Sequence, residues 1–477
     1  MHTFEDKGKG DKRKRCRRLI FLLALLFLSI SAAGGCGGGG GGGGREDSGQ
    51  PDEQPYNILQ IKWGQTALAR IEAGGMLSPR IEAAFDGSGK VHLAYFQDGS
   101  DTPYRIRYMT ADGQAPRSLS PSEPATVAGI DNCAALSLAL GQDNLPVIAY
   151  RGGMIRECGR EQQSDAMISL KSDTWAEYTG AIGVVERNPV FHDGLAGTEI
   201  SAVVDSQGNV HLAYQFFYEG CDAMNQRYPD LCYVRKDRSA LDGAVPEETV
   251  EGNQYDGDNI QNSVGYHCAL TLDGEENPVI FYYAELPDHT QGLRVARKRN
   301  GVWEKEWIEE GCVVGSIACA RCDAGGFLGV AYYVEEYSDG YGDGYSGGQV
   351  DSHCLRYAQE IASSWEGASS QGEGSFWRVQ MVDNASFCGD YCSLAYDAEG
   401  SAAIAYYELK SHSGYDLNNL KLARFQQGVW KSEVVASEGD IGLYNTLWFD
   451  GSQRPVICSY SRTEDTIFLF SPYYEEE

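Results

Sequence analysis

The stretch Ile81-Glu-Ala-Ala-Phe-Asp-Gly-Ser-Gly-Lys-Val-His-Leu-Ala-Tyr95 contains two short apolar runs joined by an Asp-Gly turn, and the second run ends in tyrosine. The pattern returns at Ile200-Ser-Ala-Val-Val-Asp-Ser-Gln-Gly-Asn-Val-His-Leu-Ala-Tyr214 and, less regularly, at five other places. The closing tyrosines of the seven copies are taken as Tyr95, Tyr150, Tyr214, Tyr283, Tyr333, Tyr406 and Tyr460. Their mean spacing of about 61 residues indicates a repeated supersecondary unit.

Each unit has a second half that also carries strand signals. A short alternating run such as Leu293-Arg-Val-Ala-Arg297 is followed by a glycine turn and a Trp-led run such as Gly301-Val-Trp-Glu-Lys-Glu-Trp-Ile308. Four antiparallel strands in a unit of this length are typical of one propeller blade. The last unit stops after its third strand, so we expect Ile58–Trp63 or Thr66–Ile71 to supply the fourth. The predicted fold of residues 56–477 is therefore all-β, a seven-bladed β-propeller of four-stranded antiparallel blades, with the ring closed by an N-terminal strand.

These units resemble secreted bacterial repeat propellers of the broad sialidase-like superfamily, whose units read roughly S-L-A-L-D, then L-K-Y-A, then W. The resemblance covers about residues 57–472 and implies the fold. True sialidases carry Ser-x-Asp-x-Gly-x-x-Trp in the turn between the third and fourth strands. The corresponding turns here, Arg299–Trp303 and Gln426–Trp430, lack the Ser-x-Asp. The family's enzymatic activity is therefore not expected to follow from the resemblance.

The N-terminus has the order of segments found in an export signal. Eight basic side chains within residues 1–18 precede the uncharged run Leu19–Ala33, which is followed by Gly34, Gly35 and Cys36. This resembles a bacterial lipobox, which implies that residues 1–35 are a signal peptide and that Cys36 carries the lipid. An ordinary signal peptide and an uncleaved anchor remain alternatives. Residues 36–55 contain eight consecutive glycines and form the predicted tether.

The residue after Cys36 bears on the cellular location of the protein. In related lipoproteins an Asp at that position signals retention at the inner membrane, whereas here it is Gly37. An outer-membrane or cell-surface location is therefore expected, and a periplasm-facing orientation is the alternative.

The charge balance excludes one class of partner. The chain of 477 residues has 39 Lys and Arg against 68 Asp and Glu, and a formal net charge of −29. Without residues 1–35, which hold eight basic and three acidic side chains, 31 basic and 65 acidic residues leave −34. Nucleic acid is not an expected partner, because binding phosphates needs clustered Lys and Arg. We expect a monomer that meets the membrane only through its lipid.

The candidate site lies at the end of the propeller where the long loops emerge. Connections between second and third strands and between units are long, and long loops on a rigid scaffold often carry function. Acidic residues separated by glycine suggest a Ca²⁺ site, and neighbouring tyrosines suggest a stacking surface for a ligand. The metal candidates are Asp339, Asp343, Asp256 and Asp258, and the ligand-binding candidates are Tyr337, Tyr341, Tyr345 and Tyr255. A solvated acidic loop is the alternative interpretation.

The histidines and cysteines are interpreted as structural. His92 and His211 occupy one repeat position that is Val in other units, so we expect them to pack rather than catalyse. Twelve cysteines remain after Cys16 and Cys36 are set aside, and an even number in an exported chain favours disulfides. The local candidate pairs are Cys221–Cys232, Cys388–Cys392 and Cys133–Cys158. Neither zinc nor redox chemistry is expected at Cys319 and Cys322.

Three functions are compatible with these observations. The favoured one is a surface-anchored, non-catalytic module whose propeller end binds a glycan, a peptide or a protein. The second is a sialidase-like exo-glycosidase, which needs a Tyr and Glu pair, an acid/base carboxyl and clustered arginines. The arginines that would have to serve are Arg80, Arg151, Arg156 and Arg160. The third is a structural protein of envelope assembly that binds only protein neighbours.

Overall fold

The structure is a computed structural model whose main compact unit runs from Leu59 to Glu477. Its regular elements are all β-strands in the part of the chain that the structure describes. Among those residues, no helix is long and apolar enough to cross a membrane. The described residues are 61–71, 80–98, 104–112, 120–121, 125–130, 135–152, 165–171, 175–178, 194–218, 229–238, 245, 247–252, 263–286, 288–337, 350–361, 376–385, 387–410 and 417–474.

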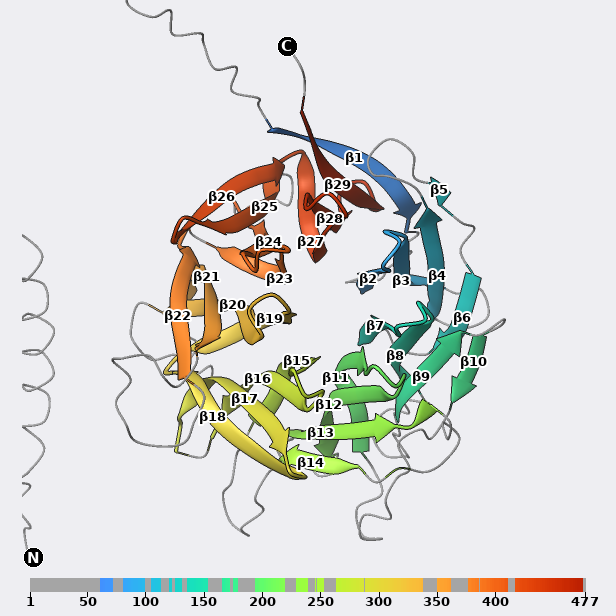
Figure 1. Ribbon diagram of the computed structural model, residues 1–477, viewed down its shortest axis with the longest axis vertical. Helices are drawn as coiled ribbons and strands as arrows, with labels where there is room; N and C mark the ends of the chain where they lie inside the picture. The colour runs from blue at the N-terminus through green and yellow to red at the C-terminus, as the bar shows by residue number, and fades with distance from the viewer. Residues whose placement is uncertain are drawn as a thin grey trace, which may run out of the picture. The chain divides into compact units, whose positions relative to one another are not determined.

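The strands pair antiparallel in sheets that follow one another along the chain and lie around a common centre (Figure 1). One short parallel pairing, of Leu417 and Asn418 with Gly439 and Asp440, joins the last two units into a single sheet. Unit 1 comprises β2 (Ile81–Phe85), β3 (Val91–Asp98), β4 (Tyr104–Asp112), β5 (Ser120–Pro121) and β6 (Ala125–Ile130). Unit 2 comprises β7 (Leu136–Leu140), β8 (Pro146–Gly152), β9 (Asp165–Lys171) and β10 (Trp175–Tyr178). Unit 3 comprises β11 (Gly194–Val204), β12 (Val210–Tyr218), β13 (Pro229–Lys236) and β14 (Glu248–Glu251). Unit 4 comprises β15 (Ser263–Leu272), β16 (Pro278–Glu285), β17 (Gln291–Arg299) and β18 (Val302–Glu310).

The remaining strands continue the same order. Unit 5 comprises β19 (Val313–Cys322), β20 (Phe327–Tyr337), β21 (Val350–Ile361) and β22 (Phe376–Asp383). Unit 6 comprises β23 (Cys388–Tyr396), β24 (Ala402–Glu408), β25 (Leu417–Gln426) and β26 (Val429–Ala436). Unit 7 comprises β27 (Gly439–Phe449), β28 (Pro455–Ser461) and β29 (Thr466–Tyr474). The first strand of each unit lies nearest the centre (Figure 1).

The fourth strand of unit 7 comes from the other end of the described chain. β1 (Ile61–Arg70) pairs antiparallel with β29, from Ile61 opposite Tyr474 to Arg70 opposite Thr466. The expectation that an N-terminal strand completes the last sheet is confirmed, and β1 includes residues from both predicted segments. Leu68 and Ile71 are 6% and 1% exposed and pack in the cluster that contains Tyr460 and Leu469.

The aspartate of the repeat stabilises the turn between the first and second strand. Oδ1 of Asp86 accepts hydrogen bonds from the amides of Ser88 and Lys90, both at 2.9 Å. A carboxylate that accepts two nearby amides fixes a tight turn, which explains why Asp recurs at this position. The same bonds, from the second and fourth residues after the aspartate, are made at Asp205, Asp273, Asp397 and Asp450.

The repeat tyrosine is a core residue, at most 2% exposed at Tyr95, Tyr150, Tyr214 and Tyr406. In unit 7 Ser459 holds this position, and the predicted Tyr460 follows it. In units 4 and 5 the buried tyrosines are Tyr282 and Tyr332, each 0% exposed. The prediction of Tyr283 and Tyr333 for this role is therefore wrong by one residue. Successive side chains of a strand face opposite sides of the sheet, so the second tyrosine of each Tyr-Tyr pair lies on the other face.

Buried ionic contacts join successive units. Tyr406 on β24 donates a hydrogen bond to Oδ2 of Asp383 at the end of β22, at 2.5 Å. Nζ of Lys421 on β25 lies 2.6 Å from the same oxygen. Two further neighbouring pairs of units have the same combination of tyrosine, carboxylate and cation, namely Tyr332 with Glu309 and Arg356, and Tyr282 with Glu251 and Arg294. The basic residue at the second position of the L-K-Y-A segment therefore ties its unit to the preceding one.

The predicted disulfide between Cys388 and Cys392 is not formed in this structure, where both are free thiols. Sγ of Cys388 lies 3.3 Å from the carbonyl oxygen of Asp383, whereas Sγ of Cys392 lies 3.2 Å from that of Ser316. The two thiols are therefore directed at different acceptors. Cys221, the expected partner of Cys232, lies outside the described residues, as do Cys133 and Cys158.

Candidate functional site

Most of the predicted site residues lie outside the described part of the chain. Of the eight, only Tyr337 falls in a described element, at the end of β20. Asp339, Asp343, Asp256, Asp258, Tyr341, Tyr345 and Tyr255 lie outside it, and so do Cys36, Arg156 and Arg160. The described residues contain no group of three or more His, Cys, Asp or Glu side chains placed to hold a metal ion. The described part of this end of the molecule consists of the strands that support the long loops.

In six units, the position six residues before the turn between the first and second strands lies near the start of the first strand. In units 1, 3, 6 and 7 it is occupied by Arg80, Glu199, Tyr391 and Tyr444, and in units 2 and 4 by Ala135 and His267. The turn residues that set this spacing are Asp86, Gly141, Asp205, Asp273, Asp397 and Asp450. Because first strands lie nearest the centre (Figure 1), this position lies on the innermost strand of each of these units or directly before it.

Arg80 interacts electrostatically with Glu82, Glu199, Tyr391 and Tyr444, and we call these five residues the central cluster. Burial alone would lower the pKa of Arg80, but the neighbouring Glu199, Tyr444, Glu82 and Tyr391 outweigh it and raise that pKa. The rings of Tyr391 and Tyr444 meet edge to face, with centroids 4.8 Å apart. A guanidinium, two carboxylates and a pair of aromatic rings thus converge from four units.

The backbone of the first strands is shaped to present this position. Tyr391 and Tyr444 have φ of 49° and 51°, in the left-handed region. Each lies two residues after a glycine that also has positive φ, Gly389 at 110° and Gly442 at 109°. The pairing of β23 with β24, and of β27 with β28, shifts register at these residues. Such bulges redirect side chains out of the regular alternation of a strand, and they are common beside binding sites.

Glu82 is a glutamate at a repeat position where three other units have a serine. That serine forms a hydrogen bond to the first strand of the next unit. In three other units this residue is a serine whose Oγ accepts an amide of the next unit: Ser137 from Ala202 at 3.0 Å, Ser201 from Leu270 at 3.0 Å and Ser393 from Leu447 at 2.9 Å. In unit 1 the residue is Glu82. Burial raises the pKa of its carboxyl to about 7, although Arg80 pulls that pKa down.

We expect Glu82→Gln to change how the stability depends on pH. A carboxyl whose pKa is higher in the folded state opposes folding as it ionises, so the wild type loses stability between about pH 4.5 and 7. The neutral amide does not titrate, so the melting temperature of Glu82→Gln should rise relative to wild type as the pH increases from 5 to 8. Parallel melting curves of the two proteins over that range check this. A constant difference would contradict the assignment of this ionisation to Glu82.

A cavity of about 280 Å³ opens between units 4 and 5. It is lined by the starts of β15 and β19 and the ends of β16 and β20, which place it at the predicted long-loop end. Its lining is aromatic and acidic, with Tyr266, His267, Tyr283, Tyr333, Glu285 and Glu335. The rings of Tyr266 and Tyr283 lie 6.4 Å apart. Because His267 occupies the same repeat position as Tyr391 and Tyr444, this cavity adjoins the ring of positions that holds the central cluster.

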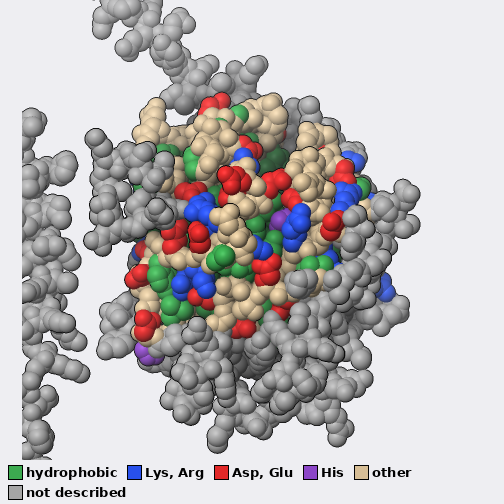
Figure 2. Space-filling view, turned by 60° about the horizontal axis from the view of Figure 1, so that its bottom comes forward, with side chains coloured by type: hydrophobic (Ala, Val, Ile, Leu, Met, Phe, Trp, Pro, Cys, Tyr) green, Lys and Arg blue, Asp and Glu red, His purple; other side chains and the backbone are tan. Residues whose placement is uncertain are grey.

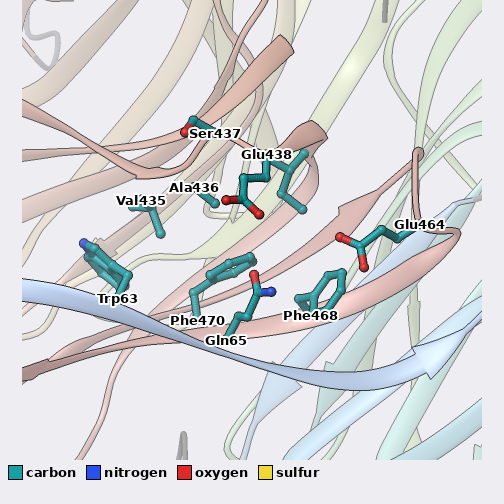
Figure 3. Close-up of a pocket in the computed structure, with 10 residues that line it drawn as sticks. Trp63, Gln65, Val435, Ala436, Ser437, Glu438, Glu464, Phe468 and Phe470 are labelled. Carbon is teal, nitrogen blue, oxygen red and sulfur yellow. The ribbon is translucent and has the colours of Figure 1, made fainter. Parts of the chain in front are cut away.

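The outer surface carries charges of both signs. Figure 2 shows Lys and Arg side chains interspersed with Asp and Glu rather than gathered in one patch. Several are paired, including Arg297 with Glu360 at 2.6 Å and Lys298 with Glu248 at 2.6 Å. A second cavity, of about 330 Å³, lies where β1 and β29 meet the end of β26 (Figure 3).

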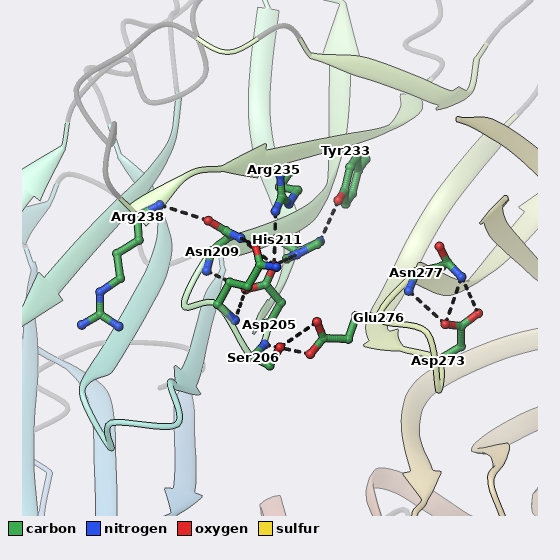
Figure 4. Close-up of polar contacts among 11 residues, drawn as sticks. Asp205, Ser206, Asn209, His211, Tyr233, Arg235, Arg238, Asp273, Glu276 and Asn277 are labelled. Atoms are coloured by element: carbon green, nitrogen blue, oxygen red, sulfur yellow. Dashed lines mark hydrogen bonds and ion pairs between the residues drawn. The ribbon is translucent and has the colours of Figure 1, made fainter. Parts of the chain in front are cut away.

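The two repeat histidines form matching buried contacts. Nδ1 of His211 lies 2.7 Å from the hydroxyl of Tyr233, and Nε2 lies 3.3 Å from Oδ2 of Asp205 (Figure 4). His92 has the same contacts with Tyr108 and Asp86, at 2.7 and 3.5 Å. His92 and His211 are 4% and 2% exposed, and burial lowers the pKa of both. These histidines contact the turn aspartates and are buried, in agreement with the structural role predicted for them.

No protein-family model matches this chain, and no curated protein matches it. Among solved structures, the polysaccharide lyase Uly1 aligns with 83% of this chain and 90% of its own, at 9% identity and a TM-score of 0.50. The fold is a β-propeller. A protein of unknown function from Dyadobacter fermentans covers 87% and 99% of the two chains, at 10% identity and a TM-score of 0.45. The Hadza microbial sialidase Hz136 covers 78% and 73%, at 12% identity and a TM-score of 0.43. At these identities the likeness concerns the fold alone.

Loop length predicts a site in the long loops and does not point to the central cluster. Arg80 enters the sequence prediction only as one of four arginines that a sialidase would need, and Arg151 of that set is buried on β8, 7% exposed. The missed signal was present in the repeat itself. When the units are aligned on the first residue of the turn, Glu82 falls where Ser137, Ser201 and Ser393 stand, so unit 1 has a charged residue at a position of small side chains.

Proposed function

We propose that this chain is a lipid-anchored, seven-bladed β-propeller that binds a carbohydrate at the long-loop end of its centre. The central cluster is the observation that carries the proposal. Carboxylates and a guanidinium provide directional hydrogen bonds for hydroxyl groups, and tyrosine rings provide flat faces for the apolar side of a sugar. The pairing of β1 with β29 supports a closed ring of seven units. The lipid at Cys36 would hold the propeller at the outer membrane or cell surface.

Arg80→Met tests the proposal on the full-length protein. Removing the guanidinium leaves Glu82 and Glu199 without their cation and removes charge-assisted hydrogen bonds to the ligand. We expect the affinity for the best ligand on a glycan array to fall at least about tenfold, which corresponds to one charged hydrogen bond. Arg378→Met, at an exposed arginine on β22, is the matched control and should bind as the wild type does.

The outcome of the array also separates the alternatives. Binding that disappears with a chelator would support the predicted Ca²⁺ role of the loops around Asp256 and Asp339. If no glycan binds, or if Arg80→Met binds as well as the wild type, the carbohydrate proposal fails and a peptide or protein partner, as in envelope assembly, becomes the better account.

A glycosidase is the second candidate, because of the pKa of Glu82. A carboxyl with a pKa of about 7 remains partly protonated at neutral pH, which suits a general acid. Tyr391 and Glu199 interact with the same arginine, so a ligand bound there would meet both. Hydrolysis of a fluorogenic glycoside panel that disappears in Glu82→Gln would establish this activity. Binding without hydrolysis would leave the protein as a binding module.

A further inference from the structure

The cavity in Figure 3 lies away from the central cluster, and its lining differs in character. Trp63 and Gln65 come from β1, Phe468 and Phe470 from β29, and Val435 and Ala436 from the end of β26. Phe468 and Phe470 are 6% and 2% exposed and form an apolar floor. Ser437, Glu438 and Glu464 complete the rim.

Two rim carboxylates have no cationic partner among the described residues. Glu438 and Glu464 are both exposed, and no ion pair or side-chain hydrogen bond is formed by either carboxylate with that part of the chain. In Figure 3 both lie on one side of the cavity, over the rings of Phe468 and Phe470, with the amide of Gln65 beside those rings. Nearby acids are paired, since Glu433 contacts Arg424 at 2.6 Å and Asp440 contacts Arg462 at 2.9 Å.

The indole of Trp63 adds a third aromatic ring to the lining. Its Nε1 is buried and finds no acceptor among the residues that the structure describes. An aromatic face beside unpaired carboxylates attracts cations through the ring quadrupole as well as through charge. A ligand that carries a cationic group would therefore meet both the carboxylates and the aromatic rings of this cavity.

We propose that this cavity binds an organic ammonium group carried on a molecule of monosaccharide or amino-acid size. A hard metal ion fits less well, because Ca²⁺ takes six to eight oxygen ligands and only two carboxylates lie here. A volume of about 330 Å³ matches a single small residue rather than a polymer segment. The excess of acidic residues in the exported chain would raise the local concentration of such a cation. The proposal does not depend on the central cluster.

Calorimetric titration of the full-length protein with two ammonium probes tests this site. The probes are glucosamine and Nα-acetyl-lysine amide, and their neutral counterparts are N-acetylglucosamine and Nα,Nε-diacetyl-lysine amide. We expect at least one ammonium probe to bind at least about fivefold more tightly than its neutral counterpart, with affinity that falls as salt is added. Binding of glucosamine alone indicates an amino sugar as the source, and binding of the lysine probe alone indicates a basic peptide.

Substitutions locate the binding in the cavity. Glu438→Gln and Glu464→Gln should each weaken the ammonium probe about threefold, and the double variant about tenfold, because both side chains are exposed and neither substitution disturbs the core. Glu399→Gln, an exposed glutamate in the turn after β23, is the control and should not change the affinity. Equal binding of charged and neutral probes, unchanged binding in the double variant, or binding of Ca²⁺ in place of both probes would overturn the proposal.

Discussion

A chain from which residues 59–70 have been deleted is expected to lose cooperative unfolding and to aggregate near room temperature. The deletion removes β1 and leaves the hydrogen-bonding edge of β29 without its partner. It also removes Leu68, which is 6% exposed, from the cluster that contains Tyr460, Ile467 and Leu469. A lost strand ladder and a lost buried leucine together exceed about 5 kcal/mol, which is the whole stability of many domains. Circular dichroism melts and size-exclusion profiles measure the effect.

Two further chains give this experiment its controls. Deletion of Gly37–Gly44 removes eight residues from the predicted tether, and the melting temperature of that chain should equal that of the wild type. A synthetic peptide of residues 59–71, added to the truncated chain, should restore a cooperative melt by pairing with β29. A truncated chain that melts within a few degrees of the wild type would show that β1 is not needed to complete unit 7.

The fold could be predicted because the residues that determine the turn and the core position lie close together in the sequence of each repeat. The turn aspartate must accept two amides, the buried tyrosine must fill the core, and both requirements act within about 15 residues of sequence. The limit of that reasoning is seen in unit 4, where the repeat pattern predicts Tyr283 and Tyr282 is the residue that is fully buried. Adjacent tyrosines are equivalent in composition, and only the strand register decides which of them faces the core.

The central cluster could not be read from local sequence because its members come from four units. Arg80 and Tyr444 are separated by more than 350 residues in the sequence and meet only because first strands gather at the centre. The bulges that turn Tyr391 and Tyr444 toward that centre depend on positive φ at non-glycine residues, which no composition rule anticipates. What the sequence did contain was a departure from the repeat, the glutamate at position 82.

Asp383→Ala is expected to lower the free energy of unfolding by about 3 kcal/mol, as is usual when one partner of a buried ion pair is removed. Asp383 and Lys421 have side chains that are each 11% exposed. The substitution leaves Tyr406 without its acceptor and Lys421 with Glu408 alone, at 3.0 Å. Because this contact joins unit 5 to unit 6, denaturant unfolding should show the loss in the midpoint of the main transition.

A double-mutant cycle and a pH series distinguish this ionic contact from a simple loss of packing. Asp383→Ala combined with Lys421→Met should be less destabilised than the sum of the single variants by about 1–3 kcal/mol, because the second change removes the stranded ammonium. Burial alone would raise the pKa of Asp383, but the hydrogen bonds from Lys421 and Tyr406 prevail and lower it. A depressed carboxyl pKa stabilises the fold above about pH 4 and ceases to do so as the pH falls through the folded value. The difference between wild type and Asp383→Ala should therefore be constant from pH 5 to pH 9, and it should shrink below pH 4. Additive single effects, or a difference that persists at low pH, would assign the loss to packing instead.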